Sequence, residues 1–177
     1  MELEPHLFNL LPKLAETGSC TLLQGCYALQ GFEKGPRTFV LDDGISYELT
    51  LTNTGAAVLI TGSIEASASS ECDRCLETAY ITLAGEVDGY AAFEALPPDI
   101  KEEIDDYILT KGSDATIDLA PLLYSALILA VPLMVICQED CAGICPSCGV
   151  NLNEGPCTCD HDPVDKNHPF AALKDLL

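Results

Sequence analysis

The ten cysteines are the residues best suited to chemistry, and six of them lie between Cys137 and Cys159. One compact set occurs in CPSCGVNLNEGPCTC and comprises Cys145, Cys148, Cys157 and Cys159. In CPSCG, Gly149 can adopt the positive φ of a tight turn, which directs backbone N–H groups toward the sulfurs. The last two cysteines are two residues apart, so they point to the same side of an extended strand. This spacing predicts a structural zinc site with four thiolate ligands.

A second set combines cysteines that are far apart in the chain. It comprises Cys72 and Cys75 in ECDRCLE with Cys137 and Cys141 in CQEDC. Closing the intervening loop costs about 4 kcal/mol of chain entropy, whereas structural zinc supplies on the order of 10 to 16 kcal/mol. We therefore predict a second zinc site, which ties a turn between two strands to the segment leaving a helix. Spacing alone leaves open an exchange of ligands, in which Cys141 or His161 serves the other site.

Other readings of the cysteines involve redox chemistry. Cys72 and Cys75 could form a redox pair, but no βαβ pattern surrounds them. Cys141, Cys145 and Cys148 match C-x₃-C-x₂-C, the spacing by which radical enzymes hold an iron–sulfur cluster. The alternative function is thus an iron–sulfur redox or radical enzyme, although a radical enzyme needs a large α/β barrel around its cluster. The remaining Cys20 and Cys26 are predicted to be small buried hydrophobic residues.

Other catalytic machinery is scarce in this sequence. The three histidines, His6, His161 and His168, lie near the chain ends. No glycine-rich phosphate loop, HExxH motif or nucleophile elbow is present. A zinc ion with four protein ligands also has no open position for water. We therefore predict a protein that is not an enzyme, with no catalytic residues and no small-molecule substrate.

The composition restricts the partners and the compartment. Eight Lys and Arg against 28 Asp and Glu give a formal charge of -20, which repels phosphate and attracts cationic proteins. A generic nucleic-acid binder is therefore disfavoured. The N-terminus MELEPHLFNLLPKLAE lacks the positive charge and apolar stretch of a signal peptide. We expect a cytoplasmic protein, where thiols stay reduced and closely spaced cysteines bind metal.

The predicted elements define an α+β fold. Residues 45 to 90 alternate apolar and polar side chains and predict a small antiparallel β-sheet or partial barrel. The segment Leu119–Cys137 carries no charge and is long enough to suggest a membrane span, but Pro121 and Pro132 argue against one. We predict instead a long buried helix over Leu119–Ala130, with Asp118 as its N-cap. Short helices are expected at Leu3–Ala15 and in the last ten residues, and an acidic loop at 97–107. The predicted domains are a 1–134 core and a 135–177 cysteine-rich, zinc-ribbon-like tail.

The ordered motifs CDRCLE, IDLAPLLYSALILAVPL, CxxxCAGICPSCGVNLNEGPCTC and PFAALKDLL resemble the YceD family of large ribosomal RNA subunit accumulation proteins. Cys72, Arg74 and Cys75 match the CxRC of that family, and its ribbon is matched by Cys145, Pro146, Cys148, Gly149, Asn153, Cys157 and Cys159. The resemblance implies a bacterial cytosolic protein needed for normal accumulation of 23S rRNA. Because the chain is so acidic, the expected partner is a basic large-subunit ribosomal protein or a pre-ribosomal particle, and direct contact with rRNA stays open.

Overall fold

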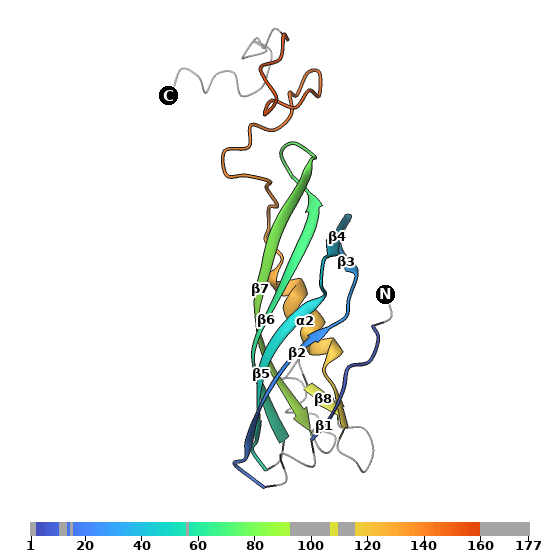
Figure 1. Cartoon of the computed structure of the whole chain (residues 1–177), viewed down its shortest axis with the longest axis vertical. Helices are drawn as coiled ribbons and strands as arrows, with labels where there is room; N and C mark the ends of the chain where they lie inside the picture. The colour runs from blue at the N-terminus through green and yellow to red at the C-terminus, as the bar shows by residue number, and fades with distance from the viewer. Residues whose placement is uncertain are drawn as a thin grey trace, which may run out of the picture.

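The computed structural model describes residues 3–10, 14, 16–55, 57–92, 107–109 and 116–159. Its strands are β1 Leu7–Asn9, β2 Cys20–Tyr27, β3 Gly31–Lys34, β4 Arg37–Leu41, β5 Ile45–Asn53, β6 Ala57–Glu71, β7 Thr78–Ala92, β8 Tyr107–Leu109 and β9 Thr116–Asp118, and its helix is α2 Ala120–Ala130. The described part of the chain is therefore mostly β-sheet with a single helix. Its shape is elongated, and the cysteine-rich segment lies beyond the tip of the β6–β7 hairpin (Figure 1).

Two long antiparallel strands form the spine of the sheet. β6 and β7 pair along their whole length, from Ala57 opposite Ala92 to Glu71 opposite Thr78. The other edge of β6 pairs with β5 in its first half and with β4 near its end. β2 then pairs with β5, and β3 with β4. Because apolar residues alternate along these strands, one face of the sheet is buried. The predicted antiparallel sheet is confirmed. It is larger than predicted, because it has seven strands in the described residues and two of them are 15 residues long.

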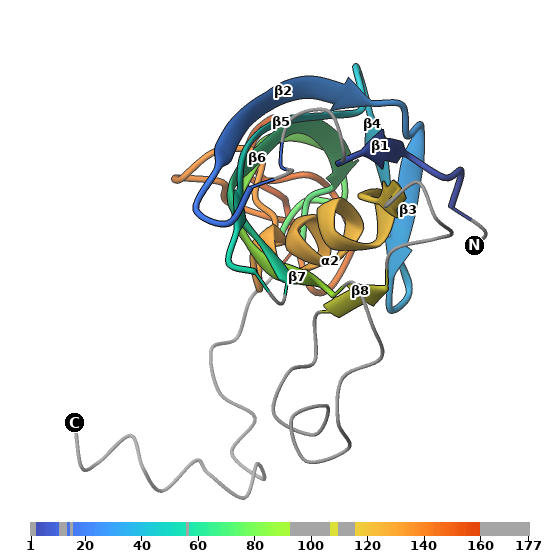
Figure 2. The ribbon, with the colours of Figure 1, turned by 90° about the horizontal axis from the view of Figure 1, so that it is seen from below.

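The sheet curls around α2, which lies on its buried face (Figure 2). The chain bends sharply between β4 and β5 at Gly44, whose φ is +79°. A Cβ atom at Gly44 would lie 2.3 Å from the carbonyl oxygen of Tyr27, so only glycine fits there. β8 pairs in parallel with the end of β7, and β1 pairs with β9 in a separate two-stranded sheet.

The helix is shorter than the long buried helix that the apolar run predicts. α2 has 11 residues, because Pro132 forces Val131 into an extended conformation and ends the helix. The N-cap is Leu119, while the Asp118 carboxylate accepts a hydrogen bond from the backbone N–H of Ala120. The buried side chains of the helix are Ala120, Leu122, Leu123, Ala126 and Leu127, whereas Leu129 is 78% exposed. No helix in the described part of the chain is long and apolar enough to cross a membrane.

The predicted N-terminal helix is wrong where the structure describes it. Residues Leu7–Asn9 form strand β1, because backbone pairing with β9 overrides a weak helical pattern. Residues 97–106 of the predicted acidic loop and the predicted helix at 168–177 lie outside the described residues.

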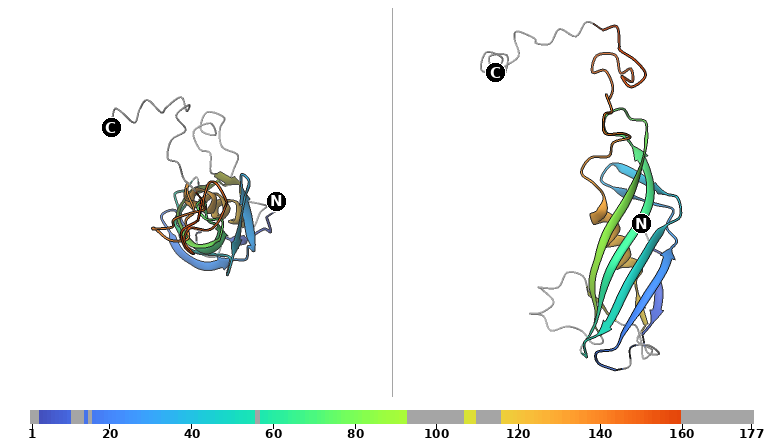
Figure 3. Two further views of the ribbon diagram at one scale, coloured as in Figure 1. Left: turned by 90° about the horizontal axis from the view of Figure 1, so that it is seen from above. Right: turned by 60° about the vertical axis from the view of Figure 1, so that its left-hand side comes forward.

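The helix runs alongside β7 (Figure 3) and approaches its backbone closely at Gly85. A Cβ atom at Gly85 would lie 2.9 Å from the carbonyl oxygen of Ala126 and 3.2 Å from the Cβ of Ala130. The missing side chain therefore lets the helix rest directly on the strand.

We expect Gly85→Val to lower the free energy of unfolding by about 1 to 3 kcal/mol, because the new side chain must push the helix away from the strand. Chemical denaturation of the two proteins measures this difference. The neighbouring Ala84 is exposed, so Ala84→Val serves as the control and should change stability by less than about 0.5 kcal/mol. Equal stability of the two variants would show that the close approach is not tight.

Candidate metal centres

Two groups of four cysteines gather within the described residues. The hairpin centre comprises Cys72, Cys75, Cys137 and Cys141, and the tail centre comprises Cys145, Cys148, Cys157 and Cys159. Within each group, all four sulfur atoms lie within 4.8 Å of one another. The geometry therefore brings together the two sets that the sequence predicts, and either set could hold a metal ion. His161, the alternative ligand, lies outside the described residues.

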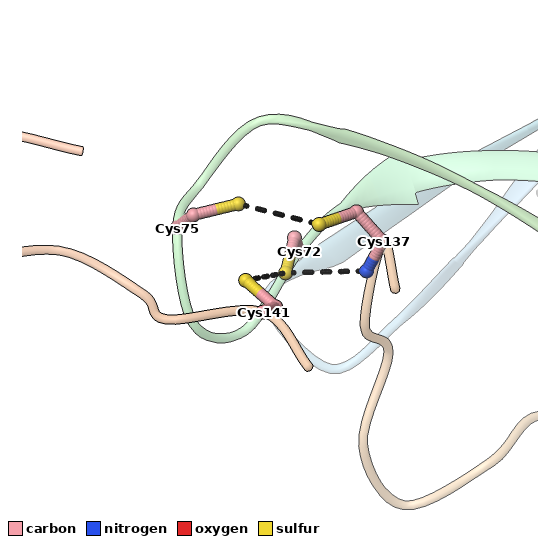
Figure 4. Close-up of side chains that lie close together, drawn as sticks. All are labelled: Cys72, Cys75, Cys137 and Cys141. Atoms are coloured by element: carbon pink, nitrogen blue, oxygen red, sulfur yellow. Dashed lines mark hydrogen bonds between the residues drawn. The ribbon is translucent and has the colours of Figure 1, made fainter. Parts of the chain in front are cut away.

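The hairpin centre joins two distant parts of the chain. Cys72 and Cys75 lie in the turn between β6 and β7, and the other two cysteines lie on the segment that follows α2. The sulfur of Cys75 is 3.6 Å from that of Cys137, and the sulfur of Cys72 is 3.9 Å from that of Cys141 (Figure 4). Zinc–sulfur bonds of about 2.3 Å place the corners of a tetrahedron about 3.8 Å apart. The spacing of the sulfurs thus fits one tetrahedral metal ion.

Backbone donors stabilise a thiolate at Cys72 of the hairpin centre. Its sulfur accepts hydrogen bonds of 3.4 Å from the N–H groups of Arg74 and Cys137. Burial opposes ionisation of this thiol, but the backbone donors outweigh it and lower the pKa of Cys72 to about 6. Burial, together with the neighbouring sulfurs, raises the pKa of Cys137 to about 12. Four thiols this close cannot all lose their protons unless a cation balances the charge.

The tail centre repeats this arrangement on a short stretch of chain. The sulfur of Cys145 accepts hydrogen bonds of 3.4 Å from the N–H groups of Ser147 and Cys148. Burial opposes ionisation, yet these donors and the nearby sulfurs lower the pKa of Cys145 to about 6. The hydrogen bond with the Cys148 sulfur, followed by burial, raises the pKa of Cys159 to about 12. Each centre therefore combines one cysteine whose pKa is lowered to about 6 with another whose pKa is raised to about 12.

Asp73 fastens the hairpin turn to the segment after the helix. Its backbone N–H donates to the carbonyl oxygen of Val135 at 2.8 Å, and its carboxylate accepts from the Val135 N–H at 2.6 Å. The same carboxylate forms an ion pair with Arg37 at the start of β4. The Arg37 guanidinium and then the Val135 N–H hold the pKa of Asp73 below its usual range. These contacts of Asp73 position Cys137 opposite the turn. They join residues that are far apart in the chain, so no local pattern in the sequence indicates them.

The two CxxC turns differ at the residue that follows the second cysteine. In the tail centre this residue is Gly149, with φ +74°, whereas the hairpin centre has Leu76, with φ +64°. The N–H groups of both residues donate to the carbonyl oxygen of the first cysteine in their turn. Leu76 thus adopts a conformation that is costly for any residue with a Cβ atom, and its side chain is 60% exposed. The sequence does carry a signal for this strained position, because Leu76 follows its CxxC motif where Gly149 follows the other.

The structure separates the cysteines of the radical-enzyme motif. Cys141 belongs to the hairpin centre, whereas Cys145 and Cys148 belong to the tail centre. The surrounding sheet is antiparallel, apart from the short β7–β8 pair, and forms no α/β barrel in the described residues. The prediction that Cys20 and Cys26 are buried is wrong, because both lie exposed on β2, whose pairing with β5 places them on the outer face of the sheet.

We expect Leu76→Gly to raise the free energy of unfolding of the protein by about 1 kcal/mol, because glycine adopts a positive φ without steric cost. Denaturant titration measures the gain. Leu76→Ala keeps a Cβ atom and should give no such gain. If alanine stabilises the protein as much as glycine does, the exposed side chain and not the backbone conformation is responsible.

Comparison with known proteins identifies relatives of this chain. The family model described as large ribosomal RNA subunit accumulation protein YceD matches residues 60–177. An uncharacterized protein of Mycobacterium tuberculosis strain H37Rv is 30% identical over 145 residues, covering 81% of this chain and 68% of the relative. One from Mycobacterium leprae is 27% identical over 178 residues, covering 99% of this chain and 79% of the relative. No solved structure matches.

A plant relative carries the same description. The chloroplastic large ribosomal RNA subunit accumulation protein YCED homolog 1 of Arabidopsis thaliana is 29% identical over 82 residues, covering 46% of this chain and 21% of the relative. The family match contains the hairpin turn, the helix and both groups of cysteines. The chain therefore belongs to the YceD family, whose description implies a role in the accumulation of large-subunit ribosomal RNA and names no catalytic activity.

Proposed function

We propose that each centre holds one structural zinc ion, with Cys72, Cys75, Cys137 and Cys141 as ligands of the first and Cys145, Cys148, Cys157 and Cys159 as ligands of the second. The observation that carries this proposal is the convergence of four sulfurs in each group, all within 4.8 Å of one another. Zinc favours such all-thiolate tetrahedral sites. Because four protein ligands fill the coordination sphere, these sites would stabilise the fold and leave no position for a substrate.

We further propose that the chain divides into a 1–134 core and a 135–177 metal-binding tail. The hairpin centre draws two ligands from each part, so its metal would fasten the tail to the core. Thiolate ligands need a reducing compartment, which supports a cytoplasmic location.

We propose that the protein acts without catalysis in assembly of the large ribosomal subunit and so supports accumulation of 23S rRNA. Its partner would be a basic large-subunit ribosomal protein, free or within a pre-ribosomal particle. The family description supports the process, and the formal charge of -20 supports the basic partner. The acidic protein would shield the positive charges of this partner until it meets rRNA.

The outer face of the sheet offers the surface for this contact. Glu48, Glu65 and Glu86 line a shallow hollow of about 680 Å³ on adjacent strands β5, β6 and β7. Within the described residues, the basic side chains are Lys34, Arg37 and Arg74. Each of them forms a hydrogen bond or an ion pair with a residue that does not line the hollow. The hollow therefore carries uncompensated negative charge among the residues that line it, and this charge would attract cationic side chains.

The purified protein should contain two zinc ions per chain and be colourless. Elemental analysis of metals together with an absorption spectrum measures both properties. The matched variants Cys75→Ser and Cys148→Ser each remove one ligand from one centre and should each lower the zinc content. Iron with a brown colour that fades in air would replace this proposal with the iron–sulfur alternative.

We expect a triple variant to bind much less of the basic ribosomal protein, because its hollow would repel cations. Its substitutions are Glu48→Lys, Glu65→Lys and Glu86→Lys. Co-purification from cells, followed by quantification of bound proteins and RNA, measures this loss. The control reverses Glu33, Glu139 and Glu154, which are exposed and do not line the hollow, so the net charge is the same. Tight binding of protein-free rRNA by the wild type at physiological salt would contradict the proposed partner.

A further inference from the structure

The loop between the ligands of the tail centre reaches back to the hairpin centre. Asn153 lies between Cys148 and Cys157, yet its side-chain amide donates a hydrogen bond of 3.4 Å to the sulfur of Cys141. Its side-chain oxygen accepts from the N–H of Ala142 at 2.7 Å. One amide group thus contacts a ligand of the hairpin centre and the backbone of the next residue.

The conformation of Asn153 is fixed from within the same loop. The side-chain oxygen of Asn151 accepts hydrogen bonds from the backbone N–H of Asn153 at 3.0 Å and from its side-chain amide at 2.8 Å. The N–H of Leu152 donates to the carbonyl oxygen of Gly143 at 2.8 Å. The N–H of the ligand Cys145 donates to the carbonyl oxygen of Val150 at 2.8 Å. Closing the tail centre therefore shapes the loop that presents the amide.

The loop also docks onto the turn of the hairpin centre. The N–H of Ile144 donates to the carbonyl oxygen of Arg74 at 3.0 Å. A Cβ atom at Gly143 would lie 3.0 Å from that same oxygen, so the two backbones are in close contact. The Arg74 guanidinium in turn donates to the carbonyl oxygen of Cys141 at 3.1 Å. The two centres thus share one hydrogen-bonded network.

A hydrogen bond to a thiolate ligand changes how firmly the metal is held. It disperses negative charge on the sulfur, orients the lone pairs and protects the sulfur from protons that would release the metal. Outer contacts of this kind typically contribute 10- to 100-fold to metal affinity. Asn153 supplies such a contact to Cys141 only while its own loop keeps the described conformation.

We propose that Asn153 is a positioning residue that couples the two centres, so that metal in the tail centre increases the retention of metal in the hairpin centre. Coupling between two binding equilibria is reciprocal, so metal in the hairpin centre strengthens the tail centre by the same factor. The inference rests on the proposed metal sites and adds that they load cooperatively.

The test uses the full chain loaded with Co²⁺, whose thiolate absorption bands report each occupied site. A competing chelator removes the metal, and the loss of absorption is followed with time. Cys148→Ser lacks a ligand of the tail centre, so the phase that remains in this variant identifies the hairpin centre. We expect both Cys148→Ser and Asn153→Ala to accelerate metal release from the hairpin centre about tenfold or more.

The double variant decides whether the coupling passes through Asn153. If it does, adding Asn153→Ala to Cys148→Ser should accelerate release no further, because the amide contact is already lost. Glu154→Gln changes an exposed side chain in the same loop, so it is the control and should release metal at the wild-type rate. Asn153→Asp keeps an acceptor for the Ala142 N–H but loses the donor, so it should behave like Asn153→Ala.

Three results would overturn the inference while leaving the proposed function intact. The first is an Asn153→Ala protein that binds two metals and releases metal from the hairpin centre at the wild-type rate. The second is a Cys148→Ser protein that releases metal from the hairpin centre at the wild-type rate. The third is a double variant in which the two accelerations of metal release multiply. A wild-type protein that binds no metal would instead contradict the proposed function itself.

Discussion

The convergence of four cysteine sulfurs at the tip of the β6–β7 hairpin is the constraint on which the rest of the structure depends. Cys72 and Cys75 lie in the turn between β6 and β7, and Cys137 and Cys141 lie on the segment that follows α2. Four thiolates this close would need a cation at their centre, and structural zinc binding on the order of 10 to 16 kcal/mol would exceed the roughly 4 kcal/mol of chain entropy lost on closing the loop. One metal ion can therefore fix the direction in which the chain leaves the helix.

The rest of the fold brings these cysteines to one place. The long pairing of β6 with β7 carries the turn away from the body of the sheet, and α2 rests on β7 at Gly85. Pro132 ends the helix early enough for Val135 to meet Asp73. The acidic outer face of the sheet stays free of these contacts, so the surface proposed for the partner is separate from the metal centres.

The sequence was sufficient to predict the sheet, the helix and the compact set of cysteines in the tail, because each has a local signal. The β-branched alternation predicts β5 to β7, and the CPxCG motif predicts the turn at Gly149. Contacts between distant residues carry no such signal. The ion pair of Arg37 with Asp73 and the strand at Leu7–Asn9 depend on tertiary pairing, and the exposure of Cys26 depends on which face of β2 is buried. Pro132 indicated the end of the helix at Ala130, and only the description of this 11-residue helix as long was wrong.

X-ray absorption spectroscopy at the zinc edge of the purified protein is the most direct test of the central claim, that two closed all-thiolate centres hold this chain together. The account predicts a first coordination shell of four sulfur atoms at about 2.3 Å around each zinc ion, with no lighter ligand. An average shell that includes nitrogen or oxygen, or bound water at either ion, would contradict it, because at least one centre would then be open or built from other residues.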